Sequence, residues 1–272
     1  MRLLVKIGGA ALEDDHARQQ LACSIATARE SGHEIIVVHG GGNQIRELTG
    51  RLGIESRYHD GLRITDAETA QAVVMVLGGL VNRLLVASLE SAGVGAVGLT
   101  GADGSTFRAA RYSPDGKDLG FVGSVHTSSS DLVDLLLGQG YTPVLATVAP
   151  LADDEQGDRS HFYNINADMG AGPLARALGA TTLLFLTDVP GVLDHAGAIL
   201  PRITPEQCES LKQGGVIHGG MIPKVDAALS ALEQNPDAQV KIAPAGGATS
   251  VLDGLDPEVG TLFCLDGGAL DG

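Results

Sequence analysis

Positive charge is scarce in this sequence. Its 272 residues include 18 lysines and arginines against 33 aspartates and glutamates, so the formal net charge is −15. A chain this acidic is a poor match for nucleic acid or for an anionic membrane surface. Any anionic ligand must therefore be met by a local cluster of positive groups. Lysine is especially rare, since the chain has only five: Lys6, Lys117, Lys212, Lys224 and Lys241.

Cysteines and long apolar runs are also few. The three cysteines are isolated, with neither a CxxC spacing nor the even number expected of a disulfide framework. The apolar run at the N-terminus is too short for a signal peptide, and no stretch of about 18 uncharged apolar residues is present. We therefore expect a cytoplasmic protein without a membrane partner.

Several common catalytic motifs are absent. The sequence contains no GxxxxGK[ST] phosphate-binding loop, no GxSxG nucleophile motif and no HExxH, and we expect no resident metal site. One GxGxxG match occurs at 93–98, but it follows an expected helix and leads into an expected strand. A dinucleotide-binding turn has the opposite order. This match therefore predicts an ordinary helix end and turn.

Glycine, in contrast, is abundant: 38 of 272 residues, about twice the usual frequency of ~7%. Near-continuous apolar runs that end at glycines alternate with amphipathic segments, which is typical of an α/β fold with a parallel sheet covered on both faces. The expected strands are 3–7, 34–39, 95–99, 142–146, 182–186 and 239–242; the expected helices are 14–30, 66–91, 129–139, 167–179, 205–213 and 221–233. We also expect a hairpin or projecting loop at 107–124, and Thr65 as the capping residue of helix 66–91.

Two of the glycine turns could bind an anion together. Lys6 stands near the end of the first expected strand, directly before Ile7-Gly8-Gly9, and His39-Gly40-Gly41-Gly42 ends the second. Either turn alone would be ordinary turn chemistry. If the strands are neighbours in a parallel sheet, both turns lie at its carboxyl edge, where ligands bind in open α/β folds. Their backbone N–H groups could then surround an anion beside the lysine.

Three further segments carry polar groups at the ends of expected elements. Asn164, Asn166 and Asp168 precede or open the helix 167–179; they could simply cap it, but capping needs only one side chain. Leu186–Val192 is a strand end with a Pro-Gly turn, which is also what a plain strand-to-helix connection looks like. Lys224 lies just inside the start of the last expected helix, where a cation is unfavourable by a few tenths of a kcal/mol. That cost favours a functional role for this lysine.

Taken together, these segments resemble the amino-acid kinase family. The matching stretches occur in the order of the family and cover nearly the whole chain: KIGGA (6–10), HGGG (39–42), GLRITDAET (61–69), VLGGLVN (76–82), VGLTGADG (97–104), LGFVG (119–123), YNINAD (163–168), LTDVPGVL (186–193) and GGMIPKV (219–225). The resemblance is greatest to the members that phosphorylate N-acetyl-L-glutamate in arginine biosynthesis.

The resemblance implies a fold, a reaction and an assembly. The fold is a three-layer αβα sandwich with a mainly parallel central sheet, in which lobe 1–178 binds the acylated amino acid and forms the dimer, and lobe 179–272 binds ATP. The reaction transfers the γ-phosphoryl group of ATP, carried with Mg²⁺ held mainly by the phosphates, to the side-chain carboxylate, without a covalent enzyme intermediate. Because the first strand begins at about residue 3, we expect no helix before it, and hence a homodimer built through helix 66–91 that L-arginine does not inhibit.

The resemblance also implies roles for individual residues. Lys6 and Lys224 would neutralise the transferring phosphoryl group, and Asp168 would orient both lysines. The substrate would be bound by Gly41, Gly42, Arg63, Asn164 and Asn166. The nucleotide would be bound by Gly8, Gly9, Thr187, Asp188, Val189, Pro190, Gly191, Val192, Leu193, Val216, Ile217 and His218.

The chain departs from the family at two turns, and two other functions compete. Asn43 stands where proline is common, and Ala245-Gly246 where many relatives carry an Asp-Gly-Arg segment. The nearest enzymatic alternative is the kinase of lysine biosynthesis that acts on carrier-protein-bound α-aminoadipate. A catalytically silent sensor of amino acids or nucleotides is the alternative from a different class.

Overall fold

The centre of the molecule is an eight-stranded sheet. The computed structural model describes residues 1–265, and its main sheet has the strand order β12-β14-β13-β11-β1-β2-β8-β5. The strands are β1 (Arg2–Ile7), β2 (Glu34–His39), β5 (Ala96–Leu99), β8 (Thr142–Ala146), β11 (Thr182–Thr187), β12 (Arg202–Ile203), β13 (Gln239–Pro244) and β14 (Thr261–Phe263). Neighbours are parallel except β13 and β14. The prediction of a mainly parallel sheet is confirmed.

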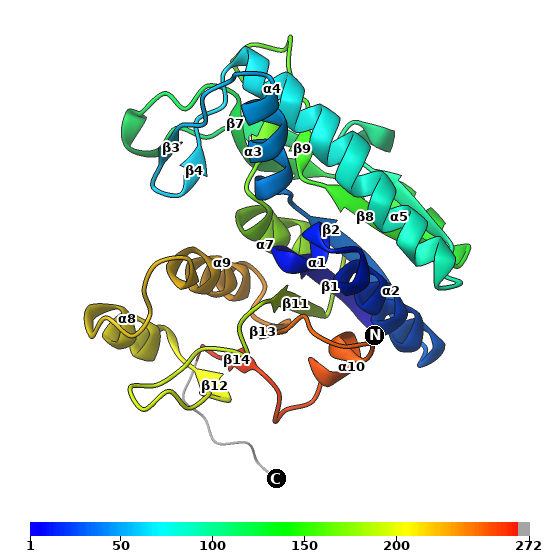
Figure 1. Ribbon diagram of the computed structural model, residues 1–272, viewed down its shortest axis with the longest axis vertical. Helices are drawn as coiled ribbons and strands as arrows, with labels where there is room; N and C mark the ends of the chain where they lie inside the picture. Colours follow the sequence, from blue (N-terminus) through cyan, green and yellow to red (C-terminus); the bar gives the residue numbers. More distant parts are fainter. Residues whose placement is uncertain (266–272) are drawn as a thin grey trace.

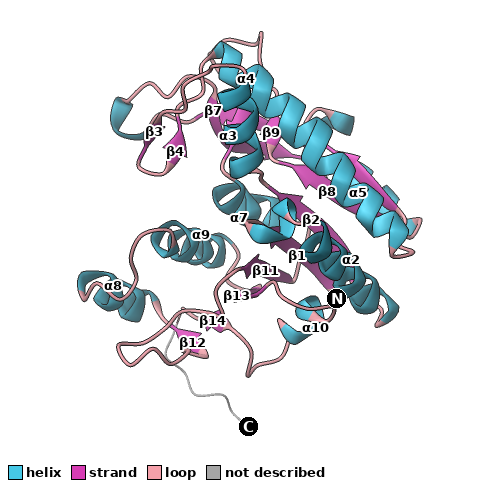
Figure 2. Cartoon of the chain, viewed as in Figure 1, coloured by secondary structure: helices cyan, strands magenta, loops and turns pink. Residues whose placement is uncertain are grey.

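Helices cover both faces of this sheet (Figures 1 and 2). The helices are α1 (Ala10–Glu13), α2 (Asp15–Glu30), α3 (Gly42–Arg51), α4 (Ala67–Val74), η1 (Met75–Val81), α5 (Asn82–Ser91), α6 (Asp131–Gly138), α7 (Ala167–Ala177), α8 (Pro205–Gln213), α9 (Met221–Gln234) and α10 (Ser250–Asp253). On one face, α2, α3, α4, α5 and α10 share a buried apolar cluster; on the other, α6, α7, α8 and α9 share a second one. These are the three layers of an αβα sandwich.

Alternation along the strands decides which side chains reach which face. In β1, Leu3, Val5 and Ile7 belong to the cluster with α2, whereas Leu4 belongs to the cluster with α7. Successive side chains of a strand point to opposite faces, so Lys6 points to the α7 face. The same rule turns His39, at the end of β2, to the opposite face, towards the η1 and α5 segments.

Two smaller sheets border the sandwich. The strands β6 (Phe107–Arg111), β7 (Val122–Ser128), β10 (Tyr163–Ile165) and β9 (Val148–Ala149) form a four-stranded sheet, and β3 (Tyr58–His59) pairs with β4 (Leu62–Arg63) in a short hairpin. Strands β6 and β7 are antiparallel, so the segment 107–124, expected as a hairpin or a projecting loop, is part of a hairpin that extends to Ser128. The GxGxxG match at 93–98 begins just after α5 and runs into β5, as expected of a helix end and turn that leads into a strand.

One long helical rod runs along the outside of the sandwich (Figure 1). It comprises α4, η1 and α5, and its middle part, η1, is π-helical rather than α-helical, which the sequence did not predict. Its cap is Asp66, whose carboxylate accepts the backbone N–H of Thr69; the expectation of Thr65 was wrong, because the Thr65 hydroxyl donates to the Arg63 carbonyl.

By length and composition Ala67–Ser91 could cross a membrane, a test that core helices of soluble proteins also pass. Val73, Leu77 and Leu85 of this rod are in fact buried against the sheet.

The expected lobe boundary does not interrupt the main sheet. Strand β1 pairs with β2 on one side and with β11, which follows the boundary at 178, on the other. The division into two lobes therefore stays a prediction about function. The last seven residues of the expected second lobe, 266–272, lie outside the described residues.

Candidate active site

The two glycine turns lie side by side. Strands β1 and β2 are parallel neighbours with Ile7 opposite His39, so Gly8-Gly9 and Gly40-Gly41-Gly42 follow at the same edge of the sheet. Both turns line one cavity of about 280 Å³. The condition attached to the sequence prediction, that the strands be neighbours, is therefore met.

Lys6 reaches this cavity across the α7 face. Its Nζ lies 2.6 Å from Asp168 Oδ1, in the first turn of α7, and its side chain is only 7% exposed. Gly8 leaves the room that this requires, because a Cβ at Gly8 would lie 2.9 Å from the same Nζ. A charged pair this close and this sheltered holds the ammonium in one place.

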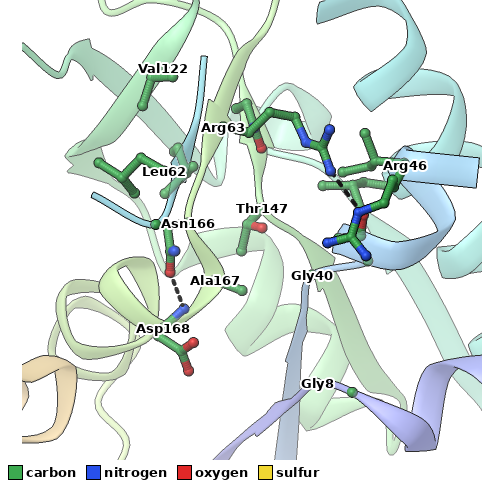
Figure 3. Close-up of a pocket in the computed structure, with 18 of the residues that line it drawn as sticks. Gly8, Gly40, Arg46, Leu62, Arg63, Val122, Thr147, Asn166, Ala167 and Asp168 are labelled. Atoms are coloured by element: carbon green, nitrogen blue, oxygen red, sulfur yellow. Dashed lines mark hydrogen bonds between the residues drawn. The ribbon is translucent and has the colours of Figure 1, made fainter. Parts of the chain in front are cut away.

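The three polar residues before and within α7 have three different contacts. Asn166 caps the helix: its Oδ1 accepts the backbone N–H groups of Asp168 and Met169. Asp168 faces Lys6, and Asn164 Nδ2 lies 3.3 Å from the Thr65 hydroxyl. All three line the cavity, and Figure 3 shows Asn166 and Asp168 at its lower side. Capping explains only one of them.

Arg63 comes to the cavity from the β3–β4 hairpin. Its guanidinium donates to Ser56 Oγ (2.7 Å) and to the Gly42 carbonyl (3.0 Å), and it lies 4.8 Å from the centre of the Tyr58 ring. Burial lowers the pKa of this guanidinium from its ordinary value, and the nearby charge of Arg46 lowers it further. Arg63 therefore joins the hairpin to the second glycine turn as well as facing the cavity.

Arg46 is a cavity residue that the sequence reasoning missed. It belongs to α3, a helix that was not predicted, and its guanidinium points to the same part of the cavity as that of Arg63, near Gly40 (Figure 3). The available signal was the apolar spacing of Ile45, Leu48 and Leu52 after the glycines. Helix α3 begins at Gly42, so its positive N-terminal end also faces the cavity.

The charge of the cavity is opposite to that of the protein. Its lining includes Lys6, Arg46 and Arg63 but a single carboxylate, Asp168. With two glycine turns and two helix N-termini at the same place, the surplus is positive. In a chain of net charge −15, this is the local cluster of positive groups that an anionic ligand requires.

Lys224 lies on the far side of this edge, in the first turn of α9. Its Nζ is 3.5 Å from the Gly220 carbonyl, and no bond joins it to Asp168 among the described residues. Asp188 links the two lysines electrostatically: the Thr187 hydroxyl donates to it and lowers the pKa of its carboxyl, and the charges of Lys224 and Lys6 lower that pKa further. The charges of Lys6 and Lys224 thus both act on the Asp188 carboxylate.

The expected nucleotide segments are only partly available to a ligand. Residues 187–193 start at the last residue of β11, at the same sheet edge, and 216–218 lie shortly before α9, but neither segment lines the cavity. Val192 and Ile217 are buried in the apolar core, so any contact they make with a ligand would come from their backbone. His218 bonds to the Val216 carbonyl through its Nδ1.

The sequence profile of the amino acid kinase family matches residues 1–242. The chain belongs to this family. It is 46% identical over 265 residues to the acetylglutamate kinase of Solibacter usitatus, which covers 96% of this chain and 98% of that protein. It is 42% identical over 251 residues to the acetylglutamate kinase of Koribacter versatilis, with 92% and 93% covered.

A solved structure has a similar fold. The crystal structure of smu.665 from Streptococcus mutans is similar with a TM-score of 0.78 at 30% sequence identity, and 97% of this chain and 99% of that chain are covered. The three-layer sandwich expected from the sequence is therefore the fold of the family.

Proposed function

We propose that this protein is an acetylglutamate kinase, which transfers the γ-phosphoryl group of ATP to the side-chain carboxylate of N-acetyl-L-glutamate in arginine biosynthesis. The observation that carries the proposal is identity of 42–46% to acetylglutamate kinases over nearly the full chain. The cavity supports it independently, because three cations and two glycine turns around one carboxylate suit a reaction between anions.

The chemistry needs placement more than proton transfer. The acceptor carboxylate is ionised at pH 7, so it attacks the γ-phosphorus without a general base. One of its oxygens forms a bond to that phosphorus, the bond to the β–γ bridging oxygen breaks, and ADP leaves with the negative charge. The barrier lies in bringing two anions together and in stabilising the charge on the phosphoryl oxygens.

The residues of the site divide between the two substrates. Lys6, held by Asp168, faces the transferring phosphoryl group together with the backbone N–H groups of Gly8 and Gly41. Arg63 and Asn164 bind the α-carboxylate and the acetamido group of the acceptor. Lys224 neutralises the phosphates from the other side, next to Asp188.

The nucleotide arrives as its Mg²⁺ complex, and the metal is a part of the substrate. We assign ATP to the segments 187–193 and 216–218, and hence to the second lobe, while the acceptor binds in lobe 1–178. This division follows the sheet edge, because the acceptor cavity lies beyond β1 and β2 and the nucleotide segments lie beyond β11.

The assembly and the compartment are proposed on separate grounds. We assign a homodimer to the rod formed by α4, η1 and α5, whose outer side exposes Met75, Leu80 and Leu84. A cytoplasmic enzyme agrees with the three free cysteines and with the biosynthetic reaction.

Release of ADP with several acceptors offered in parallel tests the function. N-acetyl-L-glutamate, L-glutamate, L-aspartate and N-acetyl-α-aminoadipate are each incubated with MgATP and the purified protein. We expect turnover with N-acetyl-L-glutamate to exceed the other three by at least about 100-fold, as a site built for one polar substrate allows. Preference for the aminoadipate derivative, or no turnover with any acceptor, would replace this function by one of the two alternatives.

A further inference from the structure

A buried histidine stands directly before the second glycine turn, on the side of the sheet away from Lys6. His39 is 0% exposed. Its Nδ1 lies 2.9 Å from the carbonyl oxygen of Gly40, and its Nε2 lies 3.0 Å from Nδ2 of Asn82, the first residue of α5. The reaction proposed above uses neither residue.

The bonds of Asn82 determine which nitrogen of His39 carries the proton. Asn82 Nδ2 donates one hydrogen to the Val144 carbonyl (2.9 Å) and the other to His39, while Arg83 donates to its Oδ1. His39 Nε2 must therefore accept, so Nδ1 carries the proton and donates it to Gly40. Burial, which lowers the pKa of His39 to about 4, keeps the ring in this neutral form.

The Asn82 amide is closely surrounded, and its hydrogen bonds fix its orientation. A Cβ at position 98 would lie 1.8 Å from Asn82 Oδ1, and only glycine at that place in β5 admits the side chain. Asn82 is itself fully buried. Each polar atom of the Asn82 and His39 side chains has a partner, and such a completed buried network is rigid.

This network acts on the part of the turn that faces the cavity. The peptide between Gly40 and Gly41 is planar and trans, so its N–H points away from its C=O. Because the Gly40 carbonyl accepts from the buried imidazole, the Gly41 N–H of the same peptide points away from that imidazole. Gly41 is also fixed by the rod, since a Cβ there would lie 2.8 Å from Leu77 Cδ2 of η1.

We propose that Asn82 and His39 are positioning residues that orient the second glycine turn and so set the affinity of the site for the acceptor carboxylate. The residues that hold the turn, Leu77 and Asn82, both belong to the rod, so the rod and the anion site form one mechanical unit. The identity of the acceptor rests on the proposed function; the positioning role does not.

Two substitutions of His39 test its two hydrogen bonds separately, the one to Asn82 and the one to Gly40. His39→Gln places an acceptor near the position of Nε2 and keeps the bond to Asn82, but it loses the donor to Gly40. His39→Asn places a donor near the position of Nδ1 and keeps the bond to Gly40. We expect His39→Gln to raise the KM for N-acetyl-L-glutamate about ten-fold, the effect of losing one net hydrogen bond, and His39→Asn to raise it no more than about three-fold.

The double variant tests whether the two residues act in series. Asn82→Ala should raise the same KM, but His39→Gln with Asn82→Ala should raise it no further than the larger single effect, because residues of one network are not additive. The KM for ATP should change less than two-fold throughout. Independent, multiplying effects on KM, or folded variants with wild-type KM, would overturn the proposal even though the wild type phosphorylates N-acetyl-L-glutamate.

Ser24→Ala provides the control for a purely structural loss. Ser24 is fully buried in the same layer and bonds to Ser250 and to the backbone of Val251, away from the cavity. It should lower the thermal unfolding temperature without changing either KM. Equal KM changes in Ser24→Ala would mean that general destabilisation, and not positioning, moves the KM.

A measurement on the wild type is independent of how the variants fold. In ¹⁵N-histidine NMR spectra, His39 should be a neutral Nδ1–H tautomer from pH 8 to about 5, and its signals should shift when N-acetyl-L-glutamate, or inorganic phosphate as a simple anion, binds. A protonated or Nε2–H imidazole, or signals that saturating anion leaves unchanged, would contradict the proposal.

Discussion

At the scale of single residues, the site is determined by which face of a strand each side chain takes. Lys6 and His39 both lie near the ends of neighbouring strands. Because successive side chains of a strand point to opposite faces of the sheet, Lys6 contacts Asp168 on one face and His39 contacts Asn82 on the other. The sequence predicted Lys6 and Asp168 because a scarce lysine beside glycines and a surplus of polar residues before a helix are local signals. It did not predict the His39–Asn82 pair, because partners 43 residues apart are known only from the packing of the rod on the sheet.

Lys6→Ala should impair the chemical step. Removal of one fixed donor to the phosphoryl group lowers kcat by roughly 10²–10³-fold. The fold should persist because 20% of the Asp168 side chain is exposed, although the Oδ1 atom that faces Lys6 is buried. Steady-state kinetics with both substrates and circular dichroism measure this. Lys212→Ala is the matched control, since Lys212 pairs with Asp226 on the outer helices and should keep the wild-type kcat. A kcat within ten-fold of wild type in Lys6→Ala would remove Lys6 from the chemistry.

The buried imidazole predicts a pH dependence of stability. Because the pKa of His39 falls from 6.5 to about 4 on folding, the unfolded chain takes up a proton in this range and the folded chain does not. The contribution of neutral His39 to the free energy of unfolding is present in full above pH 6.5. It is lost as the pH falls towards 4, which lowers the free energy of unfolding by about 3 kcal/mol. Urea unfolding of wild type and His39→Asn at pH 7, 5.5 and 4 measures it, and the gap between the two proteins should shrink by that amount. A constant gap would show that His39 titrates normally in the folded state.

At the scale of elements, the helix that follows the second glycine turn is the main part of the site that sequence reasoning missed. Glycines at its start and within it, Gly42 and Gly50, lower the helix propensity of α3, and its stability comes from Ile45 packing in the core. The π-helical segment η1 was missed for a similar reason, because its extra residue per turn has no signal in a 3.6-residue pattern. Among the helices without glycine in their interior, α8 was predicted with its correct bounds, and α2 and α9 were predicted to within one residue.

Arg63 joins the β3–β4 hairpin to the start of α3, so its substitution tests how these two elements together form the acceptor site. In Arg63→Ala the cavity loses a guanidinium, and the Gly42 carbonyl loses its partner. We expect the KM for N-acetyl-L-glutamate to rise about 10- to 100-fold, since a charge-assisted bond contributes about 1.5–3 kcal/mol, with a smaller change in the KM for ATP.

Arg63→Lys separates charge from geometry in the same experiment. An ammonium cannot donate to Ser56, to Gly42 and to a carboxylate with the geometry of a planar fork. We therefore expect this variant to remain closer to Arg63→Ala than to the wild type. An unchanged KM in both variants would place the acceptor elsewhere.

At the scale of the whole molecule, the family fold was predictable because its signal is repeated along the chain. Each strand of the parallel core is a buried apolar run, and β1, β2 and β8 are wholly apolar between their ends apart from Lys6. The short strand β12 at the edge, its neighbour β14 and the antiparallel step between β13 and β14 were not predicted. Their two or three residues are too few for a period-two pattern, and only the neighbouring strand decides their direction.

The exposed side of the rod predicts how two copies meet. Met75, Leu80 and Leu84 are 61%, 53% and 40% exposed. Met75 and Leu80 are five residues apart, and the wider π-helical turn between them brings them towards the same side of the rod. In a monomer this apolar stripe would face water, so we expect a homodimer by sedimentation velocity.

Leu80→Glu with Leu84→Glu should give monomers, because burying two carboxylates in an interface is costly. Leu135→Glu is the matched control: Leu135 is 61% exposed on α6, and its substitution should leave the dimer intact. If the rod and the glycine turn form one mechanical unit, the monomeric variant should also show a raised KM for N-acetyl-L-glutamate. A dimer that survives both glutamates would place the interface on another surface.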